Sequence, residues 1–227
     1  SLGVQPDVLV CRTEHPMQKG MKEKIALFCN VDADAVIESR DAETIYDVPL
    51  LMLQERLDEV VLRKLGIATF PDADLTRWND FLRRYKNPKA EVHIGLVGKY
   101  VELKDAYKSI KEALEHAGAE SETKVHIKWV HSEKLTAKNV SKHLSGLAGI
   151  LVAPGFGHRG IEGKIEAIKY AREHKVPFLG ICLGMQCAVI EFGRNVLGYA
   201  DANSTEMNAD TTHPVIAMME EQKGIAN

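Results

Sequence analysis

The chain has 227 residues, 45% of them hydrophobic, and a net charge of −3. This length suits one large domain or two small ones, and the charge gives no reason to expect nucleic acid or an anionic membrane as a partner. The apolar runs are far shorter than the roughly 20 residues that span a bilayer. Four cysteines occur without a Cys-x-x-Cys pair, which favours a reducing cytoplasmic location.

The first 66 residues predict a small piece of α/β structure. Strands are expected over 7–11 and 35–37. Helices are expected over 22–30 and 49–65, the second because its leucines and valines recur at helical spacing. These elements are too few to form a sheet by themselves, so we expect them to complete a larger one.

Residues 67–90 change character, because Pro-Asp and Asn-Pro pairs bracket one short amphipathic helix around Trp78. We expect an interdomain linker here and a new domain over 91–227. Strands and helices alternate in that domain, which predicts a mostly parallel sheet flanked by helices on both faces. Its strands are expected over 92–98, 125–130, 149–152 and 177–181, its helices over 105–116, 137–144 and 160–174, and a last strand-like run over 215–219.

The segment 176–192 predicts a buried strand, a sharp turn that holds Cys182, and a helix. Gly180 and Gly184 flank the cysteine as the glycines flank the serine of a nucleophile elbow. The turn would present the thiol beside the free N–H groups of a helix N-terminus, which favour the reactive thiolate. A core cysteine in a tight connection is the alternative.

A glycine-rich loop follows the strand expected over 149–152. Gly155, Gly157 and Gly160 match the dinucleotide fingerprint Gly-x-Gly-x-x-Gly. The match lies after the third strand rather than the first, and no acidic residue follows the next strand, so the required context is missing. A better use of the loop is an oxyanion hole, made with the N–H of Leu183. A merely structural turn remains the alternative.

Attack by a cysteine on a carboxamide requires a general base. The sequence has nine histidines, and for each a structural or solvated role is the better interpretation: His158 has no carboxylate two or three positions away to orient it, and His213 has no adjacent acid. We expect the base to lie outside this sequence.

The segments 180–186 and 154–160 resemble the class I glutamine amidotransferases, which use a catalytic triad. Residues 98–109, 203–206 and 24–30 are similar to the CTP synthase family, and the resemblance covers essentially the whole chain. It implies a class I amidotransferase fold, which is flavodoxin-like, over 91–227. It also implies that 1–66 are the C-terminal tail of a P-loop-type α/β amidoligase domain.

The resemblance also implies roles for single residues. Cys182 would be the nucleophile, with the oxyanion held near Gly155 and Leu183. The pyrimidine nucleotide UTP or CTP would contact Lys24. Glutamine would be bound by Gly155, Leu183, Gly184, Met185, Gln186 and Glu206, and ATP by Arg40, Asp41 and Ala42. Glu206 would pair with the α-ammonium of glutamine, although an acid at this place can also cap a helix.

By the same resemblance, the complete enzyme would be a cytoplasmic ligase of pyrimidine biosynthesis that uses ATP, Mg²⁺ and glutamine, with GTP as an activator. It would form tetramers and in some lineages filaments, with no nucleic-acid or membrane partner. No metal ligand is expected in this chain. The sequence starts at Ser1 and lacks the family's His-Pro-x-Glu, so we expect an incomplete and inactive chain.

Three alternatives remain open. The chain could be the glutaminase part of another synthase, such as GMP synthetase or carbamoyl phosphate synthetase, although the first 66 residues argue against this. It could be a cysteine peptidase of similar fold, which would require a histidine close to Cys182. It could also be a non-catalytic assembly module that has lost its triad.

Overall fold

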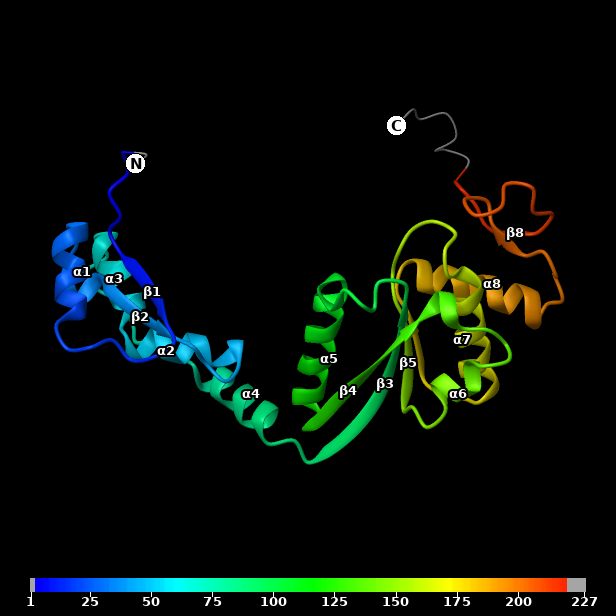
Figure 1. Cartoon of the computed structure of the whole chain (residues 1–227), viewed down its shortest axis with the longest axis horizontal. Helices are drawn as coiled ribbons and strands as arrows, with labels where there is room; N and C mark the ends of the chain where they lie inside the picture. Colours follow the sequence, from blue (N-terminus) through cyan, green and yellow to red (C-terminus); the bar gives the residue numbers. More distant parts are fainter. Residues whose placement is uncertain (1–2, 220–227) are drawn as a thin grey trace. The chain divides into compact units, whose positions relative to one another are not determined.

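The computed structural model describes residues 3–219, apart from the side chain of Lys104. The chain divides into two compact units, residues 1–83 and 84–227, each with its own sheet (Figure 1). The boundary between the units falls inside the segment 67–90. The last residues of the domain expected over 91–227, numbers 220–227, lie outside the described residues.

The first unit is built on one pair of parallel strands. Strand β1 (Leu9–Thr13) pairs with β2 (Val36–Arg40), and the register places Leu9 opposite Val36. Val36 and Ile37 are almost fully buried and form the centre of this unit. The helices are α1 (Met21–Cys29), α2 (Val48–Gln54), α3 (Leu57–Lys64) and the start of α4 (Thr76–Lys86), with 3₁₀ turns at Ala33–Ala35 and Ile45–Asp47.

The expectation of one continuous helix over 49–65 is wrong. The backbone of Arg56 has a φ of 58°, so α2 ends before it and α3 begins after it. The chain turns there because Glu55 is drawn toward β2, where its carboxylate accepts hydrogen bonds from the N–H of Glu38 (2.9 Å) and from Lys22. The apolar positions keep helical spacing through this turn, which is why periodicity alone did not reveal it.

Helix α4 contains the amphipathic stretch expected around Trp78. The indole Nε1 donates to the carbonyl oxygen of Tyr46 (2.9 Å), and the Phe81 ring meets the Tyr46 ring edge-on with centroids 5.1 Å apart. Tyr46 is itself buried. The start of α4 thus packs against Tyr46 of the same unit through aromatic contacts and one hydrogen bond.

The second unit contains a four-stranded parallel sheet with the order β4-β3-β5-β6. This order is the start of a flavodoxin-like sheet, whose ligand sites lie beyond the carboxyl ends of the strands, near the point where the strand order reverses. The elements along the chain are β3 (Ala90–Gly98), 3₁₀ turn η3 (Lys104–Tyr107), α5 (Lys108–Glu120), β4 (Thr123–His131), 3₁₀ turn η4 (Ser132–Lys134), α6 (Val140–Leu144), β5 (Gly149–Val152), α7 (Ile161–Glu173), β6 (Phe178–Gly180) and α8 (Leu183–Asn195).

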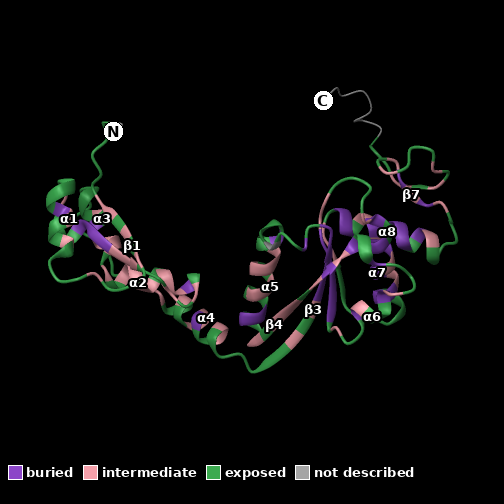
Figure 2. Cartoon of the chain, viewed as in Figure 1, coloured by how far each residue is buried: buried purple, intermediate pink, exposed green. Residues whose placement is uncertain are grey.

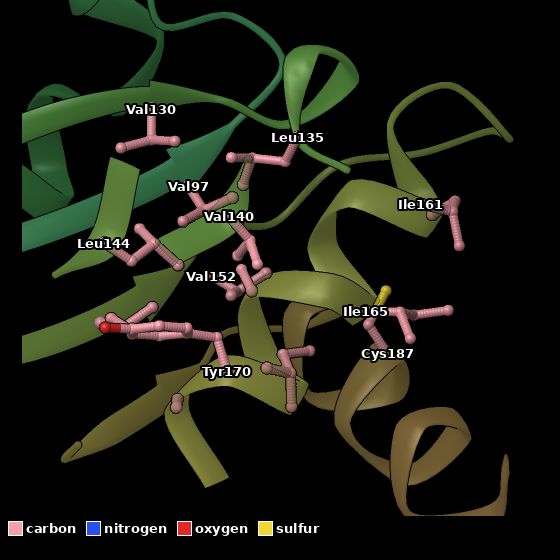
Figure 3. Close-up of a cluster of buried hydrophobic side chains, with 14 of the residues drawn as sticks. Val97, Val130, Leu135, Val140, Leu144, Val152, Ile161, Ile165, Tyr170 and Cys187 are labelled. Carbon is pink, nitrogen blue, oxygen red and sulfur yellow. The ribbon is translucent and has the colours of Figure 1, made fainter. Parts of the chain in front are cut away.

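Helices cover both faces of this sheet, as the alternation of elements predicts. Figure 1 shows α5 on one side and α6 and α7 on the other. Val97 belongs to the larger core, formed with α6, α7 and α8 (Figure 3), whereas the adjacent Leu96 belongs to a second core formed with Tyr107 and α5. The buried residues of Figure 2 accordingly concentrate in β3, β5, α7 and α8.

A small parallel pair follows α8. Strand β7 (Asn203–Ser204) pairs with β8 (Pro214–Ile216), so the strand-like run expected over 215–219 begins earlier and is shorter. Among the residues that the structure describes, no helix is long and apolar enough to cross a membrane. All four cysteines are free thiols.

Candidate active site

Cys182 lies in the elbow that the sequence predicts, between β6 and α8. Its backbone has φ 51° and ψ −109°, a conformation that residues with a side chain rarely adopt, and its side chain is exposed. The N–H of Gly184 donates to the carbonyl of Ile181 (2.9 Å), and the N–H of Gln186 donates to the carbonyl of Cys182 (3.1 Å). The cysteine is therefore the N-cap residue of α8, beside the free amides of its first turn.

The two flanking glycines are required by close backbone packing. A Cβ atom on Gly184 would lie 2.1 Å from the carbonyl oxygen of Val152, and one on Gly180 would lie 2.7 Å from backbone atoms of Gly184. Any side chain at either position would collide with main chain that has little freedom to move. The spacing that suggested a nucleophile elbow thus has the steric basis that the elbow requires.

The glycine-rich loop after β5 lies against the start of α8. A Cβ atom on Gly155 would be 3.7 Å from Cδ2 of Leu183, so the two expected oxyanion-hole positions are neighbours. The loop ends at Gly160, whose φ of 75° makes the turn into α7. Leu183 is buried, whereas Met185 is exposed and Gln186 is half-buried on the same first turn.

Two lysines that the sequence reasoning missed hold this loop. The Nζ atom of Lys164, a fully buried residue of α7, donates to the carbonyl of Ala153 (2.8 Å). The Nζ atom of Lys99, which follows β3 and is 9% exposed, donates to the carbonyl of Phe156. A lysine after a strand and a lysine within a helix ordinarily suggest solvent-exposed charges, so neither carried a signal in the sequence.

Burial sets the electrostatics around these groups. Desolvation is the main cause that lowers the pKa of Lys164, and the nearby charge of Lys99 lowers it further. Cys187 and Cys182 shift the same pKa in the opposite direction, Cys187 more strongly. Burial raises the pKa of Cys187 to about 11, so this second cysteine of α8 stays a neutral thiol within the core (Figure 3). Of the two cysteines on α8, only Cys182 is accessible to a substrate.

Glu206, the residue expected to bind the α-ammonium of glutamine, lies in the turn between β7 and β8. Its side chain is exposed, and its N–H donates to Oγ of Ser204 (3.2 Å). The structure places it at the end of a separate small sheet, whereas Cys182, Leu183, Gly184, Met185 and Gln186 lie together on the first turn of α8 and Gly155 lies beside that turn.

Two histidines have carboxylate partners that the sequence did not reveal: His126 on β4 lies 3.1 Å from Glu91 on β3, and His213 pairs with Asp201. Nδ1 of His213 lies 2.5 Å from Oδ1 of Asp201, and the ring of Tyr199 stacks on the imidazole with centroids 4.4 Å apart. Asp201 precedes His213 by a whole loop, so a search two or three positions away could not find it. Both side chains are about two-fifths exposed (41% each).

The nucleotide-contact residues expected in the first unit lie on its surface. Lys24 is exposed on α1. Arg40, Asp41 and Ala42 lie together after β2 and line two adjoining hollows of about 380 Å³ and 420 Å³. Among the described residues, no group of three or more His, Cys, Asp or Glu side chains is arranged to hold a metal ion.

A parallel sheet with a cysteine elbow at the carboxyl ends of its strands is the arrangement expected for the class I glutamine amidotransferases, and the comparisons show that class. The family model described as "Glutamine amidotransferase class-I" matches residues 102–225, and the model "CTP synthase N-terminus" matches residues 1–67. The chain belongs to the class I glutamine amidotransferases and, within them, to the CTP synthase family.

Individual relatives agree with this assignment. The chain is 63% identical to a CTP synthase of Flavobacterium psychrophilum, over 99% of this chain and 42% of the relative, and 63% identical to one of Cytophaga hutchinsonii, over 98% and 41%. It therefore spans about two-fifths of the length of these relatives. Among solved structures it is similar to the acivicin-bound glutaminase domain of the Trypanosoma brucei CTP synthase (TM-score 0.57, 42% identity), over 60% of this chain and 54% of that one.

Proposed function

We propose that this chain carries the cysteine half-site of a glutamine-hydrolysing CTP synthase. The observation that supports the proposal best is the strained and exposed Cys182 at the N-terminus of α8, between two glycines that admit no side chain. An exposed thiol at a helix N-terminus suits attack on a carbonyl carbon, whereas a core cysteine would be buried.

In the proposed reaction, the thiolate of Cys182 attacks the side-chain carboxamide carbon of glutamine. The carbonyl oxygen takes the negative charge and is held by backbone N–H groups near Gly155 and Leu183. The C–N bond then breaks and the nitrogen leaves as ammonia after gaining a proton, which gives a γ-glutamyl thioester. Water hydrolyses the thioester to glutamate and restores the thiol.

Binding of glutamine is assigned to the first turn of α8 and the loop beside it. Leu183, Gly184, Met185 and Gln186 would line the side chain of the substrate together with Gly155. The carboxylate of Glu206 would pair with the α-ammonium group, a charge-assisted bond that suits its chemistry.

The ammonia would aminate UTP to CTP at an amidoligase site, where ATP activates the 4-oxygen of the pyrimidine by phosphorylation. In this chain, Lys24 would contact the pyrimidine nucleotide, and Arg40, Asp41 and Ala42 would contact ATP.

The proposed domains are an amidoligase tail over 1–66, a linker over 67–90 and the glutaminase domain over 91–227. No Mg²⁺ ligand is proposed in this chain, as the resemblance to the family implies. GTP activation, tetramer formation and a cytoplasmic location belong to the same proposal.

The test uses a full-length protein that contains this chain and has the length of the relatives. With glutamine, UTP and ATP it should form CTP. The variant Cys182→Ser should lose glutamine hydrolysis while still forming CTP from added ammonium chloride, and the control Cys29→Ser, at another exposed cysteine, should keep both activities. Undiminished glutamine hydrolysis by Cys182→Ser would refute the assignment of the nucleophile. Absence of both activities from the unsubstituted protein would favour the assembly module.

A further inference from the structure

Two buried ammonium groups converge on the loop that precedes α7. Lys164 reaches the loop from α7 and Lys99 reaches it from the end of β3. The loop lies at the carboxyl ends of the parallel strands, where β3 and β5 are neighbours. Long polar side chains from two different elements thus hold one short stretch of irregular backbone.

The contacts of these lysines bracket Gly155. The carbonyl of Ala153 accepts from Lys164, and the carbonyl of Phe156 accepts from Lys99. A Cβ atom on Gly155 would lie 3.6 Å from Cε of Lys99 and 3.7 Å from Nζ of Lys164. The peptide groups that carry the N–H of Gly155 and of Phe156 therefore lie between two anchored carbonyls.

Lys164 has an unusual environment for a fixed positive charge. It is fully buried, and the charged or titratable groups that act on it are Cys187, Lys99 and Cys182 rather than a carboxylate. Burial of an ammonium group without an anionic partner is costly, and an apolar residue would fill the same space more cheaply. A position that keeps such a group needs a reason beyond packing.

We propose that Lys164 and Lys99 are positioning residues of the glutaminase site, which fix the loop around Gly155 so that its backbone N–H groups meet the oxyanion formed at Cys182. This inference rests on the proposed function. In this proposal the lysines act through the backbone carbonyls that they hold, and not directly on glutamine or the thiol. Hydrogen bonds from charged donors suit this task because they are stronger and shorter than neutral ones.

The test compares two reactions of the same thiol in the full-length protein. Glutamine hydrolysis passes through an oxyanion and requires the loop. Alkylation by iodoacetamide does not, because sulfur displaces iodide from a CH₂ carbon and no charge develops on an oxygen. Loss of a hole donor typically lowers kcat by 10²–10³-fold, so Lys164→Met and Lys99→Met should each lower kcat for glutamine by about 10-fold to 100-fold. The rate of Cys182 alkylation should stay within about threefold.

The control is Lys169→Met, at a half-buried lysine of the same helix, which should leave both reactions unchanged. Equal losses of hydrolysis and alkylation in Lys164→Met would show that the lysine supports the elbow itself. Unchanged hydrolysis would show that the loop does not depend on Lys164. Either result overturns the proposal. If Lys164→Met does not fold, Lys99→Met decides, because this lysine lies outside α7. An unsubstituted protein that hydrolyses no glutamine would refute the proposed function first, and this inference with it.

Discussion

The position that a Cβ atom would take on Gly184 lies 2.1 Å from the carbonyl oxygen of Val152. The first turn of α8 and the end of β5 therefore meet backbone against backbone, with no side chain between them. This contact fixes the start of α8, and hence Cys182, relative to the inner strand of the sheet. The position of the thiol is set by main-chain packing more than by any side chain near it.

Gly184→Ala should destabilise the protein by about 3 kcal/mol, because the added methyl group must displace backbone rather than a flexible side chain. Urea denaturation of the variant measures the loss. Gly146→Ala is the matched control, since Gly146 has a φ of 76° but open space around its Cβ position, and it should cost only about 1 kcal/mol. Equal losses in the two variants would contradict the steric argument.

Cys182→Gly should stabilise the protein by about 1 kcal/mol, because glycine adopts φ 51° and ψ −109° with less strain. Cys182→Ala removes the same sulfur atom but keeps the Cβ atom, so it isolates the backbone effect. Urea titration of both variants should place the glycine variant above the alanine variant. The reverse order would mean that the elbow is not strained.

Iodoacetamide at neutral pH should label Cys182 faster than the half-buried Cys11, and faster than Cys29, which is also exposed. The reason is the elbow, which presents the Cys182 sulfur beside the free backbone N–H groups of the first turn of α8. Cys187 should stay unlabelled in the folded protein, because it is buried and its pKa is raised to about 11. Peptide mass spectrometry over a time course measures the four rates, and labelling of Cys182 no faster than that of Cys29 would refute the prediction.

Arg172→Met should lower the free energy of unfolding by about 2 kcal/mol. Glu191 on α8 is almost fully buried and accepts three hydrogen bonds from Arg172 on α7, so the variant leaves a buried carboxylate unpaired. The expected loss of stability is smaller than for a fully buried ion pair, because about a third of the Arg172 side chain is exposed (35%).

The double variant Arg172→Met with Glu191→Leu provides the control. It removes both charges and should recover most of the lost stability. A double variant as unstable as the single one, in the same denaturation assay, would show that packing rather than the unpaired charge causes the loss.

The contribution of Asp201 to stability should depend on pH in the acid range. The hydroxyl of Thr212, then His213, hold the pKa of the Asp201 carboxyl below its ordinary value. The stabilisation is therefore complete above the unfolded-state pKa of about 3.9 and is lost as the pH falls further, through the folded-state value. Thermal unfolding should show a constant deficit for Asp201→Asn at pH 5–7 that shrinks below about pH 4. Asp210→Asn, at an exposed acid of the same segment, is the matched control.

Much of the second unit was predictable because its elements are regular. The strands expected over 92–98 and 149–152 exist, and the covered parallel sheet follows from their alternation with helices. The first unit was less predictable. Its break at Arg56 depends on hydrogen bonds from Lys22 and Glu38 to Glu55, which are distant in sequence and leave the apolar spacing intact.

The candidate site was also predictable only in part from the sequence. Cys182 and its glycines were visible because a nucleophile elbow has a local signature. Lys164 was not, because its burial results from the packing of α7 against a loop that precedes it, and a lysine among Ile-Glu-Gly-Lys-Ile has the appearance of a surface charge. The pairing of Asp201 with His213 escaped notice for a similar reason, since a whole loop separates the two residues.

The strained backbone at Cys182 has an evolutionary consequence. If only assembly mattered, drift would relax this position, because glycine or a repositioned turn would make a more stable domain. The chain instead keeps a cysteine in a conformation that disfavours it, between two glycines that close packing makes indispensable. A strained cysteine between two obligatory glycines is an arrangement that the proposed reaction requires and that a role as a scaffold would not require.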